Sequence, residues 1–267
     1  MRSKWFPGPR SQVAGLLLLL ATAYSLQPTA CFAQVHPHSF SPRMLSGSLQ
    51  VWLRADAITG LNDGDGVATW PDSSGNGRDF TQSTVGWRPL YKTAIRNGRP
   101  VVRFAAAGTR LDYPPGLNFT SMTVFVVGKA NAAPFTFILP SAYNWYYFAV
   151  ASNSLWWGYA TLSPPIGDRV TVIDPALGAW HVYSAWRSNI GSSYLLSQAI
   201  DGGSGTSVAV EGDPLLSTSA SIGAWPWDPP TFRPLDGDIA EIVIYNQALS
   251  DRDRQRVERY LARKWGL

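Results

Sequence analysis

Residues 236–250 read Asp-Gly-Asp-Ile-Ala-Glu-Ile-Val-Ile-Tyr-Asn-Gln-Ala-Leu-Ser, and this stretch decides the class of fold. From residue 239 to residue 245 the side chains are mostly β-branched, aromatic or small, without a helix-like spacing of polar positions. Gly237 and Asn246 bound this run as turn residues. We therefore predict a strand that is buried on both faces and central in its sheet.

A helix is expected directly after this strand, because both of its ends carry typical signals. Ser250 is a favoured N-cap residue. Acidic residues follow in the first turn and basic residues in the last, which suits the helix dipole; they are Asp251, Asp253, Arg263 and Lys264. Val257, Leu261 and Trp265 recur at four-residue spacing with Tyr260 beside them, so this apolar stripe should lie against the sheet.

The rest of the chain alternates short apolar runs with Gly and Pro, which is the pattern of an all-β sandwich. Residues 49–53 and 67–70 are expected to form an opening hairpin around a glycine-containing turn at 62–66. Further strands are expected at residues 101–104, 122–128, 135–139, 146–151, 155–159, 180–186, 193–198 and 207–210, with a tight turn at 201–203. Without an internal repeat or a second domain in the pattern, we expect one sandwich domain at residues 49–267.

Several of these segments together resemble a known family. Residues 237–250 and 257–267 are similar to the C-terminal signature of bacterial laminin-G-like domains, which belong to the concanavalin A-like lectin/glucanase superfamily. The opening hairpins of that family are matched in the same order, at residues 49–56, 70–77, 88–89 and 97–104. The resemblance implies a jelly-roll sandwich of two antiparallel sheets with a C-terminal α-helix packed on it. It does not define the function, because the superfamily contains lectins, glycosidases, lyases and adhesion modules.

The first residues have the character of an export signal. Three basic residues precede an apolar run at residues 13–20, and small residues follow as far as Ala33. The run is too short for a membrane anchor, which must cross about 30 Å of hydrocarbon. We therefore predict a signal peptide at residues 1–33 and a secreted protein, extracellular, periplasmic or on the cell surface, without membrane insertion after signal removal. A lipid anchor at Cys31 is the alternative, although Pro28 replaces the aliphatic residue that it requires.

The charge of the exported chain is close to zero. Removing residues 1–33 takes away three basic residues and no acidic residue, so the formal net charge falls from +4 to +1. This balance argues against nucleic acid or an anionic membrane as the main partner. The basic residues between 252 and 264 are interleaved with acidic ones and predict a solvated helix face. The only cysteine leaves with the signal, so we expect no disulfide, and residues 34–48 are expected to form a tether.

Eleven of the twelve tryptophans follow the signal, and many of them gather in two clusters. The first cluster spans residues 143–159, and the second is a proline-rich segment at residues 225–232. Aromatic planes stack on the C–H faces of sugar rings, while carboxylates and amides bind the hydroxyls. We predict that a glycan is bound by Trp225, Trp227, Asp228, Trp145 and Trp157. The alternative is that these aromatic residues belong to the core.

The family resemblance also implies a structural calcium ion. In related domains the loop that matches residues 72–77 helps to hold calcium together with an acidic residue of the closing strand. Calcium takes six to eight oxygen ligands, and the residues that would supply them here are Asp72, Asn76 and Glu241, with Asp238 as a further candidate. Ala240 replaces an acidic residue that many relatives have, and a simple Asx turn would also explain Asp72.

An enzyme would need a pair of carboxylates that act as acid and base. Asp236, Asp238 and Glu241 resemble the Glu-x-Asp-x-x-Glu strand of laminarinase-type glycosidases, which use two carboxylates about 5 Å apart. The first carboxylate is one methylene shorter here, and the laminin-G-like closing strand explains the same segment without catalysis. The three histidines do not have the spacing of a metal cluster.

These patterns lead to one prediction of function and two alternatives. The predicted protein is a secreted, non-catalytic binding domain of the lectin type that recognises an extracellular glycan or polysaccharide through exposed aromatic residues. The first alternative is a polysaccharide-degrading enzyme, either a glycoside hydrolase or a lyase. The second alternative is a protein-binding adhesion module.

Overall fold

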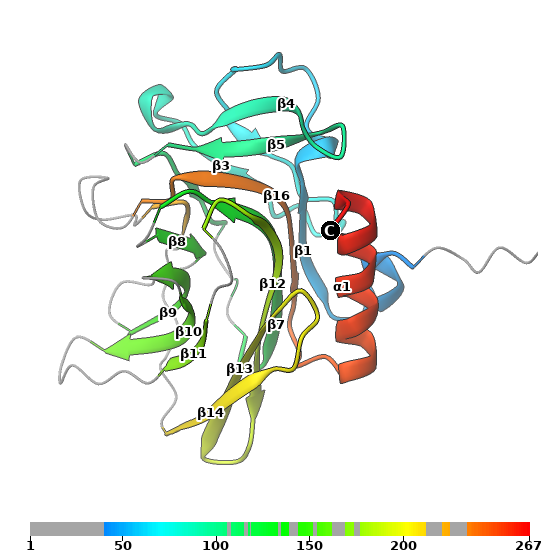
Figure 1. Cartoon of the computed structure of the whole chain (residues 1–267), viewed down its shortest axis with the longest axis vertical. Helices are drawn as coiled ribbons and strands as arrows, with labels where there is room; N and C mark the ends of the chain where they lie inside the picture. The colour runs from blue at the N-terminus through cyan, green and yellow to red at the C-terminus, as the bar shows by residue number, and fades with distance from the viewer. Residues whose placement is uncertain are drawn as a thin grey trace, which may run out of the picture. The chain divides into compact units, whose positions relative to one another are not determined.

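Two antiparallel sheets face each other in the computed structural model, and one helix covers the outer face of the first sheet (Figure 1). The structure describes residues 40–105, 108–114, 117, 119–132, 135–138, 144–151, 154–161, 169–173, 177–211, 221–224 and 234–267. The expected all-β sandwich with a C-terminal helix is confirmed. The helix α1 spans Asp251–Trp265, and three short 3-10 helices are η1 at Pro42–Leu45, η2 at Ala55–Ala57 and η3 at Val85–Trp87.

The first sheet, sheet A, has the strand order β14-β13-β12-β7-β16-β5-β4, and β1 pairs with β16 beside this path. Its strands are β1 (Leu49–Arg54), β4 (Leu90–Arg96), β5 (Arg99–Phe104), β7 (Met122–Ala130), β12 (Trp180–Asn189), β13 (Ser193–Ile200), β14 (Thr206–Glu211) and β16 (Gly237–Tyr245). The predicted turn at residues 201–203 connects β13 to β14, and the amide of Gly203 donates to the carbonyl of Ile200 at 3.0 Å.

The second sheet, sheet B, has the order β11-β10-β9-β8-β15-β6-β3-β2. Its strands are β2 (Thr69–Trp70), β3 (Phe80–Thr81), β6 (Leu111–Asp112), β8 (Phe135–Ile138), β9 (Asn144–Ala151), β10 (Ser154–Thr161), β11 (Arg169–Ile173) and β15 (Ser221–Ile222). In Figure 1, β8 to β11 and α1 lie on opposite sides of sheet A. The layers are therefore sheet B, sheet A and helix.

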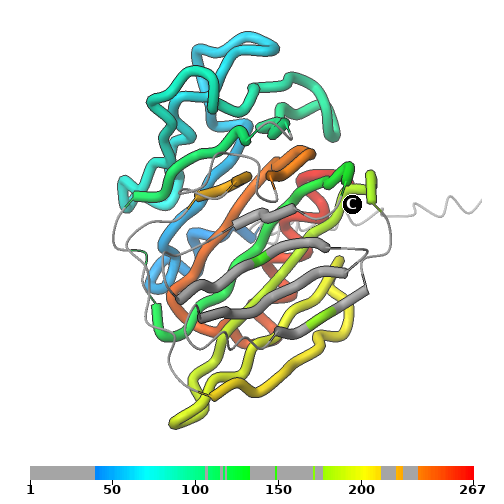
Figure 2. Tube along the Cα trace, turned by 90° about the vertical axis from the view of Figure 1, so that its left-hand side faces the viewer, coloured from blue at the N-terminus to red at the C-terminus, as the bar shows by residue number. Residues whose placement is uncertain are grey.

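Strand β16 is the centre of sheet A, as its sequence predicts, and all nine of its residues are buried. One edge pairs with β7 along its length, while the other pairs first with β5 and then with β1. Figure 2 shows this strand in orange, running between its neighbours. The register against β7 steps from Ile239 opposite Gly128 to Glu241 opposite Val127, so Ala240 is the extra residue of a β-bulge.

Two apolar cores result from these layers. The core between the sheets contains the side chains of Ile239, Ile242 and Ile244 from β16, with Trp70, Phe80, Phe104 and Phe148 among its large members. The core between sheet A and α1 contains the predicted stripe of Val257, Leu261 and Trp265, all three fully buried, against Ala240, Val243 and Tyr245. Burial of each large side chain contributes about 1.5–3 kcal/mol, so the helix belongs to the folded unit.

The N-terminus of α1 has the N-cap that the sequence predicts. Its C-terminus is held by a hairpin that is distant in the sequence. The Ser250 hydroxyl accepts from the amide of Asp253 at 3.2 Å, which confirms the N-cap. The last carbonyls of the helix accept hydrogen bonds from the hairpin of β4 and β5: Asn97 Nδ2 donates to Lys264 at 3.0 Å, and Arg96 Nε donates to Trp265 at 2.8 Å. The helix C-terminus is thus attached to the edge of sheet A.

Two sequence predictions about the beginning of the domain need correction. The expected opening hairpin does not form, because β1 pairs with β16 in sheet A while β2 pairs with β3 in sheet B. The folded unit also begins at Phe40, earlier than the predicted residue 49. Phe40 is buried against the core under α1, and its ring lies edge-on to Tyr260 with centroids 6.4 Å apart, so this part of the predicted tether is packed.

Candidate functional site

Glu241 is placed under α1 by the bulge in β16. Regular alternation would direct Ala240 and Glu241 to opposite faces of the sheet, but the extra residue lets both face the helix. The Glu241 side chain has no exposed surface. A buried carboxylate of this kind requires donors on both oxygens, because its charge has lost its contact with water.

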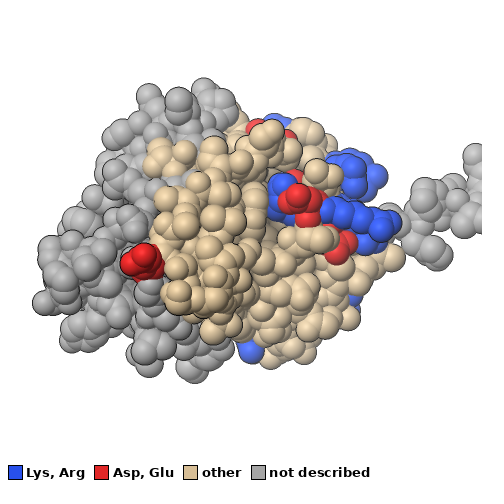
Figure 3. Space-filling view, turned by 90° about the horizontal axis from the view of Figure 1, so that it is seen from below, with Lys and Arg blue, Asp and Glu red and all other residues tan. Residues whose placement is uncertain are grey.

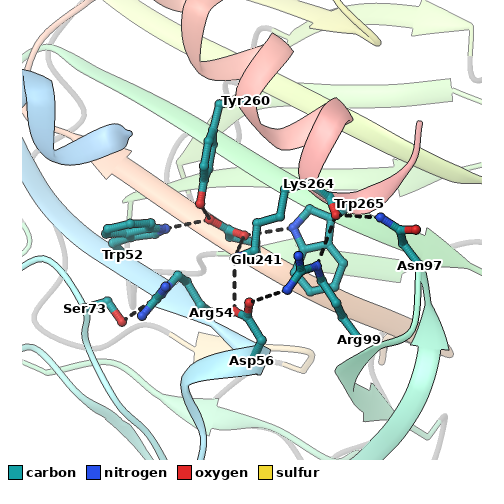
Figure 4. Close-up of polar contacts among 10 residues, drawn as sticks. All are labelled: Trp52, Arg54, Asp56, Ser73, Asn97, Arg99, Glu241, Tyr260, Lys264 and Trp265. Atoms are coloured by element: carbon teal, nitrogen blue, oxygen red, sulfur yellow. Dashed lines mark hydrogen bonds and ion pairs between the residues drawn. The ribbon is translucent and has the colours of Figure 1, made fainter. Parts of the chain in front are cut away.

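Four donors from β1 and α1 meet the Glu241 carboxylate (Figure 4). Its Oε1 accepts from Trp52 Nε1 at 2.6 Å and from the Tyr260 hydroxyl at 3.2 Å. Its Oε2 accepts from Lys264 Nζ at 2.6 Å and from Trp265 Nε1 at 2.8 Å. Burial, and secondly the charge of Glu241, raise the pKa of Tyr260 above its ordinary value, so this hydroxyl stays a donor.

A second layer of charges closes the cluster. Lys264 Nζ also binds Asp56 Oδ1 at 3.0 Å, and Arg99 Nη1 lies 3.3 Å from Asp56 Oδ2. Figure 4 shows these side chains converging from η2, β5 and α1 around Glu241. The arrangement joins the helix to the sheet, and it leaves Glu241 enclosed by groups of the fold itself.

The other two carboxylates of the predicted acid/base set are also engaged. Asp238 is fully buried and accepts from Arg103 Nε at 2.6 Å and Arg103 Nη2 at 3.0 Å, while Lys129 Nζ lies 3.5 Å away. The hydrogen bonds to Asp238 raise the pKa of Arg103. Asp236 accepts from Asn131 Nδ2 at 3.0 Å. Proton transfer needs a carboxyl group within reach of a substrate, so this geometry argues against an acid/base role for Asp238 and Glu241.

The predicted calcium ligand Asp72 forms an Asx turn that fastens its loop to β1. Its Oδ1 accepts from the amides of Trp52 at 2.9 Å and Ser74 at 2.8 Å. Its Oδ2 accepts from Ser74 Oγ at 2.6 Å and from the amide of Arg78 at 3.1 Å. Each oxygen is therefore turned toward protein donors rather than toward a common point with other oxygens.

The other calcium candidates, Asn76, Glu241 and the Asp238 described above, are also engaged by the protein. Asn76 uses its amide nitrogen to donate to the carbonyl of Leu49 at 2.9 Å, and Glu241 is surrounded by the donors described above. No cluster of three or more His, Cys, Asp or Glu side chains suited to a metal occurs within the described ranges. As they stand, Asp72 and Glu241 do not fit calcium, because an ion would have to displace their donors. Calcium binding stays a prediction of the sequence.

Most of the residues predicted to bind a glycan lie outside the part of the chain that the structure describes. Trp225, Trp227 and Asp228 lie outside the described residues. Trp145 and Trp157 have described backbones in β9 and β10, where they pair with Ala160 and Phe148, while their side chains lie outside the described part.

A groove of about 460 Å³ lies between α1 and the turn that follows β13. Its apolar lining consists of Trp180, Val182, Ala262 and Leu267. Its polar lining consists of Asp201, Gly202, Gln255, Glu258 and Arg259. This volume is within the range of small-molecule sites, which hold a few polar groups in a mainly apolar wall.

Sequence reasoning missed this groove because it treated the helix charges as a solvated face. Figure 3 shows Lys, Arg, Asp and Glu side chains gathered on one side of the molecule, where α1 lies. Arg254 and Glu258 nevertheless are only 6% and 4% exposed, and they pair at 2.8 Å. Glu258 directly follows Val257 of the buried stripe, and this position next to the stripe is the sequence signal that could have indicated its burial.

Within the described part of the chain, no helix combines the length and the apolar character that crossing a membrane requires. No protein-family model matches the chain, and no curated protein matches it in sequence.

Solved structures share the fold at low identity. Domain 4 of AbnA, a GH43 extracellular arabinanase from Geobacillus stearothermophilus solved in complex with arabinotriose, is 19% identical with a TM-score of 0.54, over 80% of this chain and 98% of that chain. The receptor-binding domain of botulinum neurotoxin type G is 10% identical with a TM-score of 0.57, over 81% of this chain and 51% of that chain.

A structure of botulinum neurotoxin type C is 12% identical to this chain with a TM-score of 0.51, over 83% of this chain and 53% of that chain. Cell entry of that toxin is described as dependent on interaction with two ganglioside molecules. The chain thus spans about half the length of the neurotoxin domains and nearly all of the arabinanase domain. These likenesses show that this β-sandwich fold occurs in solved proteins of other kinds.

Proposed function

We propose that this chain is a secreted, non-catalytic carbohydrate-binding domain of the laminin-G-like, concanavalin A-like type. The observation that carries the proposal is the likeness to the arabinanase domain over 98% of that domain's length, because that domain holds arabinotriose. The ganglioside dependence described for the type C neurotoxin gives independent support from a second kind of protein. The signal-like residues 1–33 support export, and the low formal charge supports a neutral glycan as the partner.

We propose that the domain is non-catalytic because the candidate catalytic carboxylates are buried and paired. Asp238 and Glu241 are buried and paired with Arg103 and Lys264, so their charges hold the fold together. Moving either group to a substrate would break a buried ion pair, which costs about 3–5 kcal/mol. For this reason we place a polysaccharide-degrading enzyme behind the non-catalytic domain, as the first alternative, and a protein-binding adhesion module as the second.

A glycan array on the purified protein, followed by titration calorimetry on the strongest hit, tests this proposal. We expect binding without release of reducing sugar. Trp225→Ala or Trp227→Ala alone should bind about five- to two-hundredfold more weakly, because each lost stacking plane removes contact worth about 1–3 kcal/mol, and the double variant should bind more weakly than either. Trp87→Ala, at a partly buried tryptophan of η3, is the matched control and should bind like the wild type.

Three results would redirect the proposal. Release of reducing sugar that disappears in Glu241→Gln, in a variant shown to be folded, would support the hydrolase. Binding of a protein but of no glycan would support the adhesion module. Full glycan binding by the double tryptophan variant would move the site to another part of the chain.

A further inference from the structure

The groove between α1 and the turn after β13 contains an acceptor that the fold leaves unused. Glu258 is 4% exposed, and its Oε1 accepts from Ser184 Oγ at 2.8 Å and from Arg254 Nη1 at 2.8 Å. Among the described residues, its Oε2 has no hydrogen-bond partner. A buried carboxylate oxygen without a donor is unfavourable, so a ligand that supplies one would be stabilised at this point.

Gly202 lies next to this oxygen and carries no side chain. It lines the groove, and a Cβ placed on it would lie 3.5 Å from Glu258 Oε2. Its φ of +72° lies in the left-handed region, which favours glycine. The turn therefore places a residue without a side chain opposite the unused oxygen.

The charges of the groove favour a neutral ligand. The negative charge of Glu258 is compensated by Arg254, whose guanidinium lies over the ring of Trp186 at 4.5 Å. Asp201 is held by His181 Nδ1 at 2.7 Å, and Arg259 lines the same groove with the opposite charge. The formal charges of the two carboxylates and the two arginines at the groove sum to zero, and a hydroxyl can donate to Oε2 without adding charge.

The apolar lining suits the ring of a sugar. Trp180 and Val182 on β12 line the groove of about 460 Å³ together with Ala262 and Leu267 at the helix end. An aromatic plane next to a buried acceptor is the combination that takes the C–H face and one hydroxyl of a saccharide ring. We propose that this groove binds a neutral saccharide residue, which packs on Trp180 and donates a hydroxyl to Glu258 Oε2. This site rests on the proposed carbohydrate-binding function, and it adds a candidate location among the described residues to the one predicted at Trp225 and Trp227.

Titration calorimetry with arabinotriose, laminaritetraose and cellotetraose tests the site, with choline as a cationic probe. Ala262→Phe fills the groove from the surface of α1, and Glu258→Gln changes the buried acceptor. We expect each variant to bind the saccharide at least about tenfold more weakly. Arg252→Phe adds the same ring to an exposed position of the same helix outside the groove, and it should leave the affinity unchanged.

The possible results separate this site from the function on which it rests. If the wild type binds no saccharide, either on the glycan array or in these titrations, the proposed function fails and this site fails with it. If Ala262→Phe and Glu258→Gln bind normally while Trp225→Ala/Trp227→Ala does not, the function stands and the groove is not the site. Binding of choline alone, lost in Ala262→Phe, would overturn the ligand class. If Glu258→Gln unfolds in a thermal melt, Ala262→Phe decides, because Ala262 is only half-buried.

Discussion

The Glu241 carboxylate shows how one residue can join separate layers of the fold. It receives hydrogen bonds from Trp52 on β1 and from Tyr260, Lys264 and Trp265 on α1. Removing both charges of such a pair can be neutral, but removing one leaves the other charge buried without compensation. Glu241 therefore has a large effect on stability even though the net contribution of the pair is small.

We expect Glu241→Gln to lower the free energy of unfolding by about 3 kcal/mol, because Lys264 then keeps only Asp56 as an acidic partner. Urea denaturation followed by tryptophan fluorescence measures the change. Arg252→Gln replaces an exposed charged side chain on α1 and should change the stability by less than about 0.5 kcal/mol. Equal stability of the two variants would show that the Glu241 cluster is not a stabilising joint.

The buried Tyr245 and the half-buried Tyr260 predict a loss of stability at alkaline pH. Burial is the main cause that raises the pKa of Tyr245 and Tyr260, with the charge of Glu241 adding to both. In the unfolded chain a tyrosine ionises near pH 10. Above that pH the unfolded state loses protons that the folded state keeps, so this contribution is complete below pH 10 and decreases as pH rises further.

Urea denaturation between pH 8 and pH 11 measures this dependence. We expect Tyr260→Phe to flatten the decrease, because phenylalanine does not ionise. The comparison also controls for other groups that titrate in this range, since both proteins contain them. Parallel curves for the two proteins would assign the alkaline loss to groups other than Tyr260.

At the scale of an element, α1 is held by three different kinds of contact. Ser250 caps its first turn, an apolar stripe packs on sheet A, and Arg96 and Asn97 of the β4–β5 hairpin bind its last carbonyls. The helix also supplies three of the four donors to Glu241. Its removal would expose an apolar face of the sheet and leave a buried carboxylate without its lysine.

We expect deletion of residues 251–267 to leave an aggregating chain. The milder variant Leu261→Ala should lower the free energy of unfolding by about 3 kcal/mol, since Leu261 is fully buried and its loss leaves a cavity. Arg263→Ala on the exposed side of the helix is the control, with an expected change below about 0.5 kcal/mol. An unchanged melting temperature of the truncated protein would show that the helix does not stabilise the sandwich.

A bound calcium ion would stabilise the domain as a whole. A ligand that binds only the folded state raises its stability, by about 2.7 kcal/mol at a hundredfold excess over Kd. If the predicted calcium site forms, EDTA lowers the melting temperature relative to millimolar calcium, and Asp72→Asn removes that difference. An identical melting temperature in both conditions would leave Asp72 as the Asx turn that the structure shows.

The amino-acid sequence by itself determined the two elements whose signals are local. β16 was predictable from its apolar composition and its flanking Gly237 and Asn246, and α1 from its cap, its charges and its stripe. These signals depend only on residues that are close together in the sequence, so they can be recognised without knowing which other segments the strand and the helix contact. The sandwich class followed from the same kind of spacing along the chain.

The tertiary structure alone decided which strands pair and where the charged side chains are directed. β1 pairs with β16 and not with β2, its neighbour in the sequence. This could not be predicted, because alternation along a strand specifies its buried face but not its partner. The bulge at Ala240 turns Glu241 toward α1, and the packing of that helix buries Glu258 beside the turn at Gly202. Each of these features arises from contact between segments far apart in the chain, and a reading of the sequence along its length contains no information about their distance in space.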